Sequence, residues 1–355
     1  MRRVNWPNSL IALALVLAFA GSAWADDSYF AGAADPQIAT AVAPLSQEVI
    51  PDPTTAAGEN AIYGPQTTDE SLSGGCTACC CPLWTVRAGA IFLRRDSQDN
   101  VVLTNGATPI TVGGLSFNNY QAGPMVTLFR HGVLKSPYDF EFTYFGIPSF
   151  SNTAASAGAT TFFTTPTINF APRTVTATYS SNFHSTELNL RRSWSDRLTV
   201  LGGFRWIEMR DDLAANLSGA SDTINVNNHL YGYQMGADVV IFRRGAFTID
   251  GFGKGGIYAN VADQTTTIAG VGGAVPSSGA GSTRTAFVGE LSLNGMYTIN
   301  DRWSIRSGYQ ALWLDGVALA PDQIASSNVV TGVSTLDMHG HPIYHGMTLT
   351  AQMIW

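Results

Sequence analysis

The sequence predicts an all-β protein: a transmembrane, antiparallel, up-and-down β-barrel of about ten strands (ten to twelve) behind a disordered N-terminal segment. Three observations predict this fold. Apolar and polar residues alternate with period two in many stretches from Trp84 onwards. These stretches are about 10–16 residues long, which suits tilted strands that cross a bilayer. Short and long connections alternate between them, as turns and loops do in outer-membrane barrels.

The composition favours a surface that faces lipid. Charged residues make up only 13% of the chain, about half their usual share in soluble proteins, whereas hydrophobic residues make up 45%. No apolar run of about 18 residues follows the first 25 residues, so helical membrane spans are excluded. The formal net charge is −7. An acidic chain without basic patches gives no indication of nucleic-acid binding.

Residues 1–25 have the pattern of a secretory signal peptide. Arg2 and Arg3 form the charged region, LIALALVLAFAG is the apolar stretch, and Ala23-Trp24-Ala25 predicts cleavage near Ala25. An N-terminal anchor is the alternative, but the apolar stretch is shorter than the roughly 20 residues of a spanning helix. Without Arg2 and Arg3, 17 basic residues face 26 acidic ones, a net charge of −9. We therefore expect export, and localisation in the outer membrane.

Residues 26–82 are expected to form a flexible, low-complexity periplasmic segment. They are rich in Ala, Pro, Thr, Ser, Gly and Gln and have no sustained period. CTACCC, near the end of the segment, contains Cys76, Cys79, Cys80 and Cys81. Export permits disulfides, and four cysteines allow three pairings. Disulfides within or between chains, metal binding and free thiols all remain open, because one C-x-x-C without a matched second pair is a weak zinc signal.

Residues 83–355 are expected to form the barrel. In YDFEFTYF (138–145) and LYGYQMGADVVI (230–241), for example, large apolar residues alternate with polar or small ones. Ten becomes twelve strands if TTFFTTPTINFAPRTVTATY (160–179) forms an extra hairpin. The ten predicted strands lie near residues 84–95, 122–131, 137–147, 180–193, 198–209, 229–243, 246–259, 285–298, 302–315 and 343–355.

The connections and the aromatic residues support a membrane barrel over a soluble one. HGVLKSP, SWSDR, RRGA and INDR are the short turns. The expected long loops cover residues 96–121, 148–179, 210–228, 260–284 and 316–342. A β-sandwich or lipocalin-like barrel would alternate in the same way, but aromatic residues at strand ends are typical of interface girdles. The expected girdle residues are Trp84, Tyr138, Tyr144, Trp194, Trp206, Tyr231, Tyr297, Trp303, Trp313 and Trp355.

If the apolar faces meet lipid, the polar faces line the lumen. Their mixed charges predict ion pairs across the lumen, since an unpaired buried charge is costly. About ten strands predict a narrow or plugged lumen, because open aqueous channels occur at about 16 strands. A packed polar core and a selectivity filter for small ions both remain open. The candidate lumen charges are Arg87, Glu141, Glu187, Arg191, Arg205, Asp238, Lys254, Glu290 and Arg306.

Several stretches also carry a family resemblance. They are CPLWTVRAGAIFLRR, HSTELNLRR, LTVLGGFRWIEM, LYGYQMGAD, GFGKGGIYAN and, most specifically, IRSGYQALWLDGVALAPDQ. Together, over roughly residues 80–355, they resemble the putative outer-membrane β-barrel porin family known from planctomycete bacteria. The resemblance implies an outer-membrane barrel. It implies neither a substrate nor catalytic residues.

Two further groups of residues are candidate sites. MHGHP contains His339 and His341, with His345 nearby, and we interpret all three as solvated histidines rather than as a metal site. Asp211, Asp212, His229 and Asp315 are expected near the extracellular rim, where a His–Asp pair could activate water in a hydrolase. No spacing rule singles them out. We therefore expect no catalytic site, no cofactor, no metal and no enzyme activity.

The expected function is that of a porin-like outer-membrane barrel that passes small solutes or ions through a narrow lumen. The alternative is a non-conducting structural or surface-interaction barrel that anchors extracellular loops. A rim-located hydrolase is a third hypothesis. The expected partners are the lipid bilayer, the outer-membrane assembly machinery and small solutes. Trp355 ends the alternating stretch LTAQMIW and is a candidate assembly signal at the membrane interface.

Overall fold

The computed structural model describes residues 83–96, 101–161, 169–217, 219–270, 277–328 and 331–355. The expected signal peptide, the 26–82 segment and the four cysteines lie outside the described residues. Within the described part of the chain, no helix is long and apolar enough to cross a membrane.

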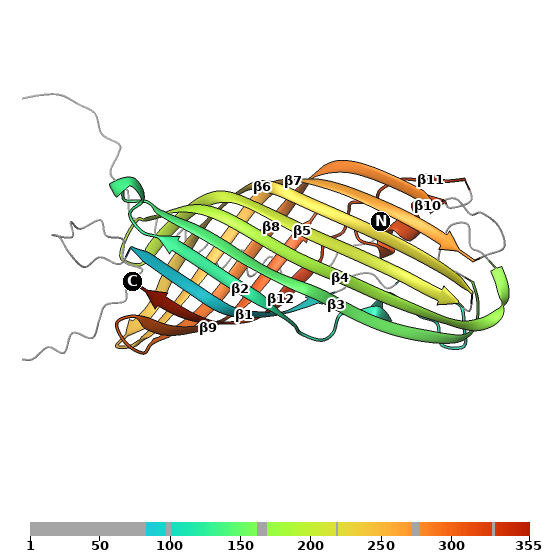
Figure 1. Cartoon of the computed structure of the whole chain (residues 1–355), viewed down its shortest axis with the longest axis horizontal. Coiled ribbons are helices and arrows are strands. Elements are labelled where there is room, and N and C mark those ends of the chain that lie inside the picture. Colours follow the sequence, from blue (N-terminus) through green and yellow to red (C-terminus); the bar gives the residue numbers. More distant parts are fainter. Residues whose placement is uncertain (1–82, 97–100, 162–168, 218, 271–276, 329–330) are drawn as a thin grey trace, which may run out of the picture. The chain divides into compact units, whose positions relative to one another are not determined.

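Ten antiparallel strands of the described chain close into one barrel (Figure 1). Neighbouring strands pair in the order β1-β12-β9-β8-β7-β6-β5-β4-β3-β2, and β2 pairs with β1 to close the ring. This confirms the predicted fold, with ten strands rather than twelve. The strands are β1 (Trp84–Asp96), β2 (Gln121–Arg130), β3 (Asp139–Thr161), β4 (Asn169–Ser193), β5 (Leu198–Leu217), β6 (Ala220–Arg244), β7 (Phe247–Ala269), β8 (Ser278–Thr298), β9 (Trp303–Asp315) and β12 (Ile343–Ile354).

The two ends of the barrel differ in their connections. At the end that we call the turn end, short turns join β2 to β3, β4 to β5, β6 to β7 and β8 to β9. The β6–β7 turn is only Gly245 and Ala246, and Gly245 has a φ of +57°, which favours glycine. At the opposite end, the loop end, long connections precede β2 and β12. The first and last predicted loops are therefore present.

The three middle loops were predicted wrongly. Residues 148–179, 210–228 and 260–284 belong mostly to strands, so that β3 to β8 are 20–25 residues long. β5 and β6, for example, are separated by residues 218–219 alone. These six strands extend well beyond the length that a bilayer requires.

The reason is that the alternating pattern reverses its phase within each long strand. In β6, Tyr233 and Met235 are 79% and 74% exposed, whereas Ile224 of the opposite parity is fully buried. β5 reverses in the same way between Trp206, which is exposed, and Ile207, which is buried. Toward the turn end the apolar side chains point outward, and toward the loop end they point into the barrel. If apolar residues are sought only at every second position in one register, the alternation ends where the apolar side chains change faces. The rest of the strand then resembles a polar loop.

The outward apolar side chains form a belt on the turn-end half of the barrel. The belt covers about ten residues of each strand, which matches the apolar band of an outer-membrane barrel. The expected girdle aromatics lie on the outward face, where Tyr138, Trp194, Tyr297, Trp303 and Trp355 are among the most exposed. The exposed apolar residues of this apolar belt include Phe92, Leu188, Leu190, Phe204, Tyr233, Met235, Val239, Ile257, Leu293, Ile305, Met347 and Leu349.

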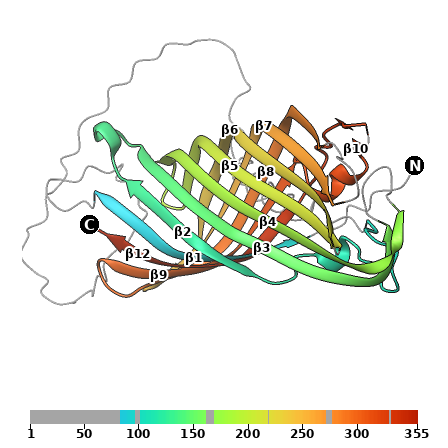
Figure 2. The same ribbon diagram turned by 45° about the vertical axis from the view of Figure 1, so that its right-hand side comes forward.

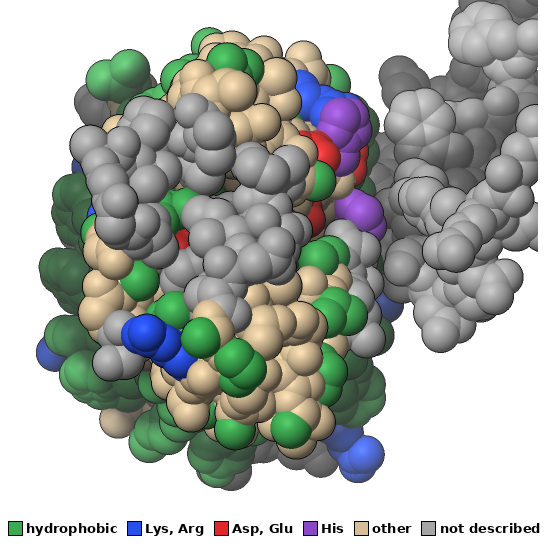
Figure 3. Space-filling view, turned by 90° about the vertical axis from the view of Figure 1, so that its right-hand side faces the viewer, with side chains coloured by type: hydrophobic (Ala, Val, Ile, Leu, Met, Phe, Trp, Pro, Cys, Tyr) green, Lys and Arg blue, Asp and Glu red, His purple; other side chains and the backbone are tan. Residues whose placement is uncertain are grey.

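Two segments pack against the inward face of the loop-end half (Figures 1 and 2). The first insert, residues 101–120, contains η1 (Gly113–Leu115) and buries Phe117, which stacks on Tyr179 of β4 at 4.7 Å. The second insert, residues 316–342, contains η3 (Pro321–Ile324), β10 (Ser327–Asn328) and β11 (Val333–Ser334). Its buried residues include Ala318 and Ala320. Viewed from this end, acidic and histidine side chains lie mainly toward one edge, whereas Lys and Arg side chains are found at several places around the face (Figure 3).

Trp355 takes part in closing the barrel. Its carbonyl accepts hydrogen bonds from the amides of Leu83 and Trp84 at 2.9 and 3.0 Å, and its own amide donates to the Trp84 carbonyl at 3.0 Å. The terminal residue thus extends the pairing of β12 with β1 by one step.

Deletion of Trp355 is expected to lower the amount of barrel in the outer membrane. The deletion removes three backbone hydrogen bonds at the closing seam, each contributing about 1 kcal/mol, together with an interfacial indole. The measurement is the amount of heat-modifiable protein in the membrane fraction. Trp194→Ala, which removes an exposed indole from a turn, is the control. Equal amounts of the truncated and the full-length barrel would count against this role.

Candidate functional site

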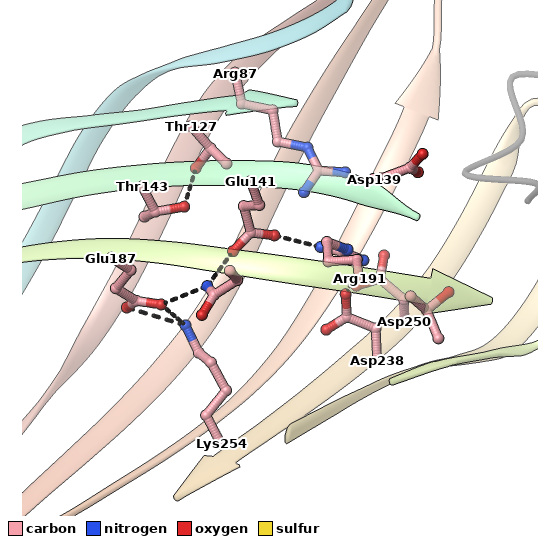
Figure 4. A network of polar contacts seen from close by, with 12 residues as sticks. Arg87, Thr127, Asp139, Glu141, Thr143, Glu187, Arg191, Asp238, Asp250 and Lys254 are labelled. Carbon is pink, nitrogen blue, oxygen red and sulfur yellow. Dashed lines mark hydrogen bonds and ion pairs between the residues drawn. The ribbon is translucent and has the colours of Figure 1, made fainter. Parts of the chain in front are cut away.

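The turn-end half of the lumen is lined by charged side chains (Figure 4). Each occupies an inward position of its strand because side chains alternate between the two faces. The structure places all nine candidate lumen charges there, either buried or half-buried. They come from eight strands: Arg87 (β1), Glu141 (β3), Glu187 and Arg191 (β4), Arg205 (β5), Asp238 (β6), Lys254 (β7), Glu290 (β8) and Arg306 (β9).

Four of these residues form what we call the deep ion cluster, near the middle of the barrel. Arg205 bonds Glu290 at 2.6 Å and lies 3.5 Å from Glu187. Lys254 bonds the same two carboxylates at 3.4 and 3.0 Å. Gln234 donates a further hydrogen bond to Glu187 at 2.7 Å. Two cations therefore share two carboxylates, and all four side chains are buried.

A second set of ion pairs lies closer to the turn end. Arg191 bonds both Glu141 and Asp238, and Arg306 bonds Asp250. Arg87 donates to Gln352 at 2.6 Å, and its guanidinium lies 4.6 Å from the centre of the Phe129 ring. Arg191 stacks on the same ring at 5.1 Å. Stacking on an aromatic face leaves the edge of a guanidinium free for hydrogen bonds.

Between these two sets is a cavity of about 60 Å³. Side-chain exposure rises from 0% at Glu187 to 26% at Asp238, that is, from the deep ion cluster toward the turn end. Water therefore reaches the lumen from the turn end. We call this space the vestibule; its lining includes Arg87, Glu141, Arg191, Asp238, Lys254 and Arg306.

On the loop-end side, Asp211 joins the barrel to the second insert. Its carboxylate bonds Arg95 at 2.6 Å and accepts hydrogen bonds from the Tyr179 hydroxyl at 2.6 Å and the Ala320 amide at 3.1 Å. Arg95 also donates to Ser181 at 3.0 Å.

Two asparagines hold the same insert further along. Asn228 of β6 accepts from the Ala318 amide and donates to the Ala318 carbonyl, both at 2.8 Å. Asn260 of β7 donates to the Gly316 carbonyl at 3.1 Å. The second insert is therefore attached to the barrel through its backbone, and its apolar residues pack into the interior.

The four residues expected at the rim do not form one group. Asp211 points inward, whereas Asp212 points outward and bonds Arg210 at 2.9 Å. His229 lies on the outward face and pairs in register with Glu208, while Asp212 pairs with Asn225. Asp315 is exposed at the end of β9.

The three histidines are also separated by the fold. His339 is exposed and bonds Asp337 at 2.6 Å, and His341 contacts the His339 carbonyl at 3.1 Å. His345 points away from the barrel on β12 and contacts Tyr309. Among the described residues, no group of three or more His, Cys, Asp or Glu side chains is placed to hold a metal ion.

Sequence reasoning missed Asp250 and Arg95, although a signal was present for each. Asp250 has the same parity in β7 as Lys254, so alternation alone places it in the lumen. Arg95 follows Arg94 in β1, and one of two adjacent residues in a strand must point inward. The role of Asp211 as a contact of the second insert had no signal, because it depends on a loop folding back over about 100 residues of chain.

The arrangement is suited to holding water and ions in the vestibule but not to passing them. The vestibule supplies hydrogen-bonding groups of both signs, whereas the two inserts and the apolar interior close the loop-end half. Passage would require the inserts to move.

The family described as putative beta barrel porin-7 (BBP7) matches residues 135–335, more than half of the chain. This range runs from the turn before β3 to β11, and it contains in full seven of the eight strands that carry the candidate lumen charges. No curated protein matches the sequence.

Solved barrel structures are similar at low identity. The outer membrane protease OmpT from Escherichia coli is 8% identical, with a TM-score of 0.47, and the match covers 77% of this chain and 96% of that one. The toluene transporter TbuX from Ralstonia pickettii is 10% identical, with a TM-score of 0.31 and coverage of 76% and 73%. A FadL homologue from Pseudomonas aeruginosa has a TM-score of 0.27 at 10% identity, with coverage of 77% and 89%. These similarities are too remote to indicate an activity for this chain.

Arg205→Met is expected to lower the free energy of unfolding by about 3–5 kcal/mol, because it leaves Glu187 and Glu290 buried with only Lys254 to balance them. Urea unfolding of the barrel in detergent micelles measures this. The control, Arg210→Met, removes an exposed pair with Asp212 and should cost less than about 1 kcal/mol. Equal losses for the two variants would contradict the importance of the deep ion cluster.

Asp211→Ala is expected to expose the second insert to protease, because Asp211 binds the insert backbone at Ala320 and fixes Arg95 and Tyr179. Limited digestion with a protease of broad specificity, followed by mass spectrometry, locates the cuts. Asp212→Ala changes the adjacent outward residue and is the control. Resistance of residues 316–342 in both variants would show that other contacts suffice to hold the insert.

Proposed function

This chain belongs to the family described as putative beta barrel porin-7, and from that premise we propose that it forms a narrow, closable pathway for small ions across the outer membrane. In this proposal the turn end faces the periplasm and the loop end faces outward, as short turns and long loops do in outer-membrane barrels. The vestibule is the inner mouth of the pathway. The second insert is the part that opens it.

The observation that carries the proposal is the vestibule. A barrel that served only as an anchor could fill its lumen with apolar side chains, which pack without a desolvation penalty. This lumen instead has polar and charged walls around a cavity of about 60 Å³, and these walls become more exposed toward the turn end. Water-accessible charges of both signs suit the stepwise binding of small ions and leave no room for larger solutes.

The closing element is a loop rather than a strand of the barrel. The second insert is bound to the wall through Asp211, Asn228 and Asn260, and its short strands β10 and β11 pair with each other rather than with a barrel strand. It could therefore leave the lumen while the ten-stranded ladder stays intact. The deep ion cluster would remain and would limit the pathway to small ions.

A specific observation favours the alternative, a non-conducting barrel. The deep ion cluster is dry: Glu187, Arg205 and Glu290 are each at most 2% exposed, and they connect strands on different sides of the lumen. If these side chains never part, the barrel anchors its projecting strands and loops without conducting.

Planar-bilayer recordings of the refolded barrel distinguish the two functions. The wild type is expected to be mostly closed. Replacement of Leu319–Asp337 by a short Gly–Ser linker is expected to give stable, small conductance steps, because it removes most of the second insert's part of the apolar closure and leaves the barrel strands untouched.

Deletion of residues 26–82 is the control, since it shortens the chain but retains both inserts. Its recordings should resemble those of the wild type. Heat-modifiable mobility on a gel shows whether the linker variant is folded. If the folded linker variant gives no conductance, the proposed pathway is overturned and the anchor function is favoured. Conductance gained only on deletion of residues 26–82 would assign the closure to that segment instead.

A further inference from the structure

A polar cluster interrupts the outward apolar face where β1, β12 and β9 meet. Arg94 and Asp96 of β1 point outward, and His345 of β12 and Tyr309 of β9 lie beside them. Tyr120, just before β2, contacts His345 edge-on at 6.3 Å between ring centres. We call these five residues the outer cluster. They come from four segments that are far apart in the sequence.

The contacts within the outer cluster run in a chain. Arg94 donates from Nε and Nη2 to Asp96 Oδ1 at 3.2 and 2.9 Å. His345 Nε2 lies 3.3 Å from Asp96 Oδ2, and His345 Nδ1 lies 2.5 Å from the Tyr309 hydroxyl. Asp96 is thus the shared acceptor, and His345 is held on both sides of its ring.

The cluster remains open to a further partner. The side chains of Arg94 and Asp96 are 35% and 43% exposed. Nη1 of Arg94 has no hydrogen-bond partner among the described residues, so one edge of the guanidinium points to the surroundings. Tyr120 and Tyr309 are about half exposed and carry hydroxyls at the edge of the cluster. A cation and an anion are therefore presented side by side.

The position of the outer cluster along the barrel axis indicates which part of the membrane surrounds it. In β1, the next outward residue toward the turn end is Phe92, which pairs with Met347 of the apolar belt. Arg94 lies about ten residues above Trp84 at the turn end, the length of one membrane crossing. The outer cluster therefore lies where the acyl region of the outer leaflet gives way to headgroups.

A shallow apolar lane continues from the cluster toward the turn end. Phe92, Met347 and Tyr309 lie in one cross-strand row, and Leu349 stands in the next row. The neighbours of Leu349 in that row are Ala90 and Ser307, which are small. Small residues beside exposed large ones leave space against the sheet for an acyl chain.

We propose that the outer cluster binds the headgroup of a zwitterionic phospholipid with a primary ammonium, phosphatidylethanolamine, with an acyl chain in the lane below. Arg94 Nη1 and the Tyr120 hydroxyl donate to the phosphate, and the Asp96 carboxylate accepts from the ammonium. This inference is independent of whether the lumen conducts.

The chemistry of the cluster separates this lipid from others. Phosphatidylglycerol has no ammonium, and its negative charge would meet the Asp96 carboxylate without compensation. Phosphatidylcholine has a cation, but its quaternary nitrogen has no N–H to donate to Asp96. Only a primary ammonium beside a phosphate satisfies both members of the Arg94–Asp96 pair.

The test measures lipid retention by native mass spectrometry. The full-length barrel is mixed with equal amounts of phosphatidylethanolamine, phosphatidylcholine and phosphatidylglycerol with identical acyl chains, and bound lipids are counted after detergent is removed. The wild type should retain phosphatidylethanolamine roughly two- to fivefold more than either other lipid, the size expected for an exposed charge pair.

Two variants separate the two halves of the site. Asp96→Asn should abolish the preference over phosphatidylcholine, because it removes the carboxylate that accepts from the ammonium. Arg94→Gln should reduce retention of all three lipids. Arg210→Gln is the matched control, since Arg210 and Asp212 form a pair with the same spacing on β5, away from the outer cluster. Heat-modifiable mobility shows that each variant is folded.

The result that would overturn the proposal is equal retention of the three lipids by the wild type, or a preference for phosphatidylethanolamine that survives in both Asp96→Asn and Arg94→Gln. A preference lost equally in Arg210→Gln would also overturn it, because the selectivity would then follow overall charge rather than this site.

Discussion

The closed ladder of backbone hydrogen bonds is the constraint on which the rest of the structure depends. A bilayer has no water to satisfy an open sheet edge, so the first and last strands must pair. Here β1 pairs with β12 over twelve consecutive residue pairs from Thr85–Ile354 to Asp96–Ile343. Once this register is fixed, the parity of every residue decides whether its side chain meets lipid or lumen. All other features of the barrel follow from that division.

A barrel of ten strands encloses a narrow interior, and charges placed there must find partners within it. In the turn-end half they do so through shared acceptors, since Arg205 and Lys254 both bond Glu187 and Glu290. In the loop-end half the interior is mostly apolar, apart from buried polar contacts such as Arg95–Asp211, and it is completed by chain folded back from two loops. The same lumen thus has a polar half that water can enter and an apolar half that excludes it. A closable pathway needs both properties.

The phase reversal of the alternating pattern marks the level of the membrane surface on the barrel. Where the surroundings change from lipid to water, the favourable direction for an apolar side chain changes from outward to inward. Polar outward residues such as Arg94 and Asp96 appear at this level on β1, and Glu208 and His229 appear at it on β5 and β6. The outer cluster is distinguished from the rest of this level by its tyrosines and by the apolar lane below it.

The sequence by itself determined the fold class, a strand number of ten to twelve and the inward position of the nine lumen charges, because each depends only on local alternation along a strand. It did not determine the length of β3 to β8. The point at which the apolar residues change from the outward to the inward face looks like the end of a strand when only one face is considered. Nor did it determine which charges pair, which loops enter the lumen, or that Arg94, Tyr309 and His345 meet. Those facts depend on the register between strands and on loops that fold back over long stretches of chain. Such contacts leave no periodic signal in the sequence, so only the tertiary structure decided them.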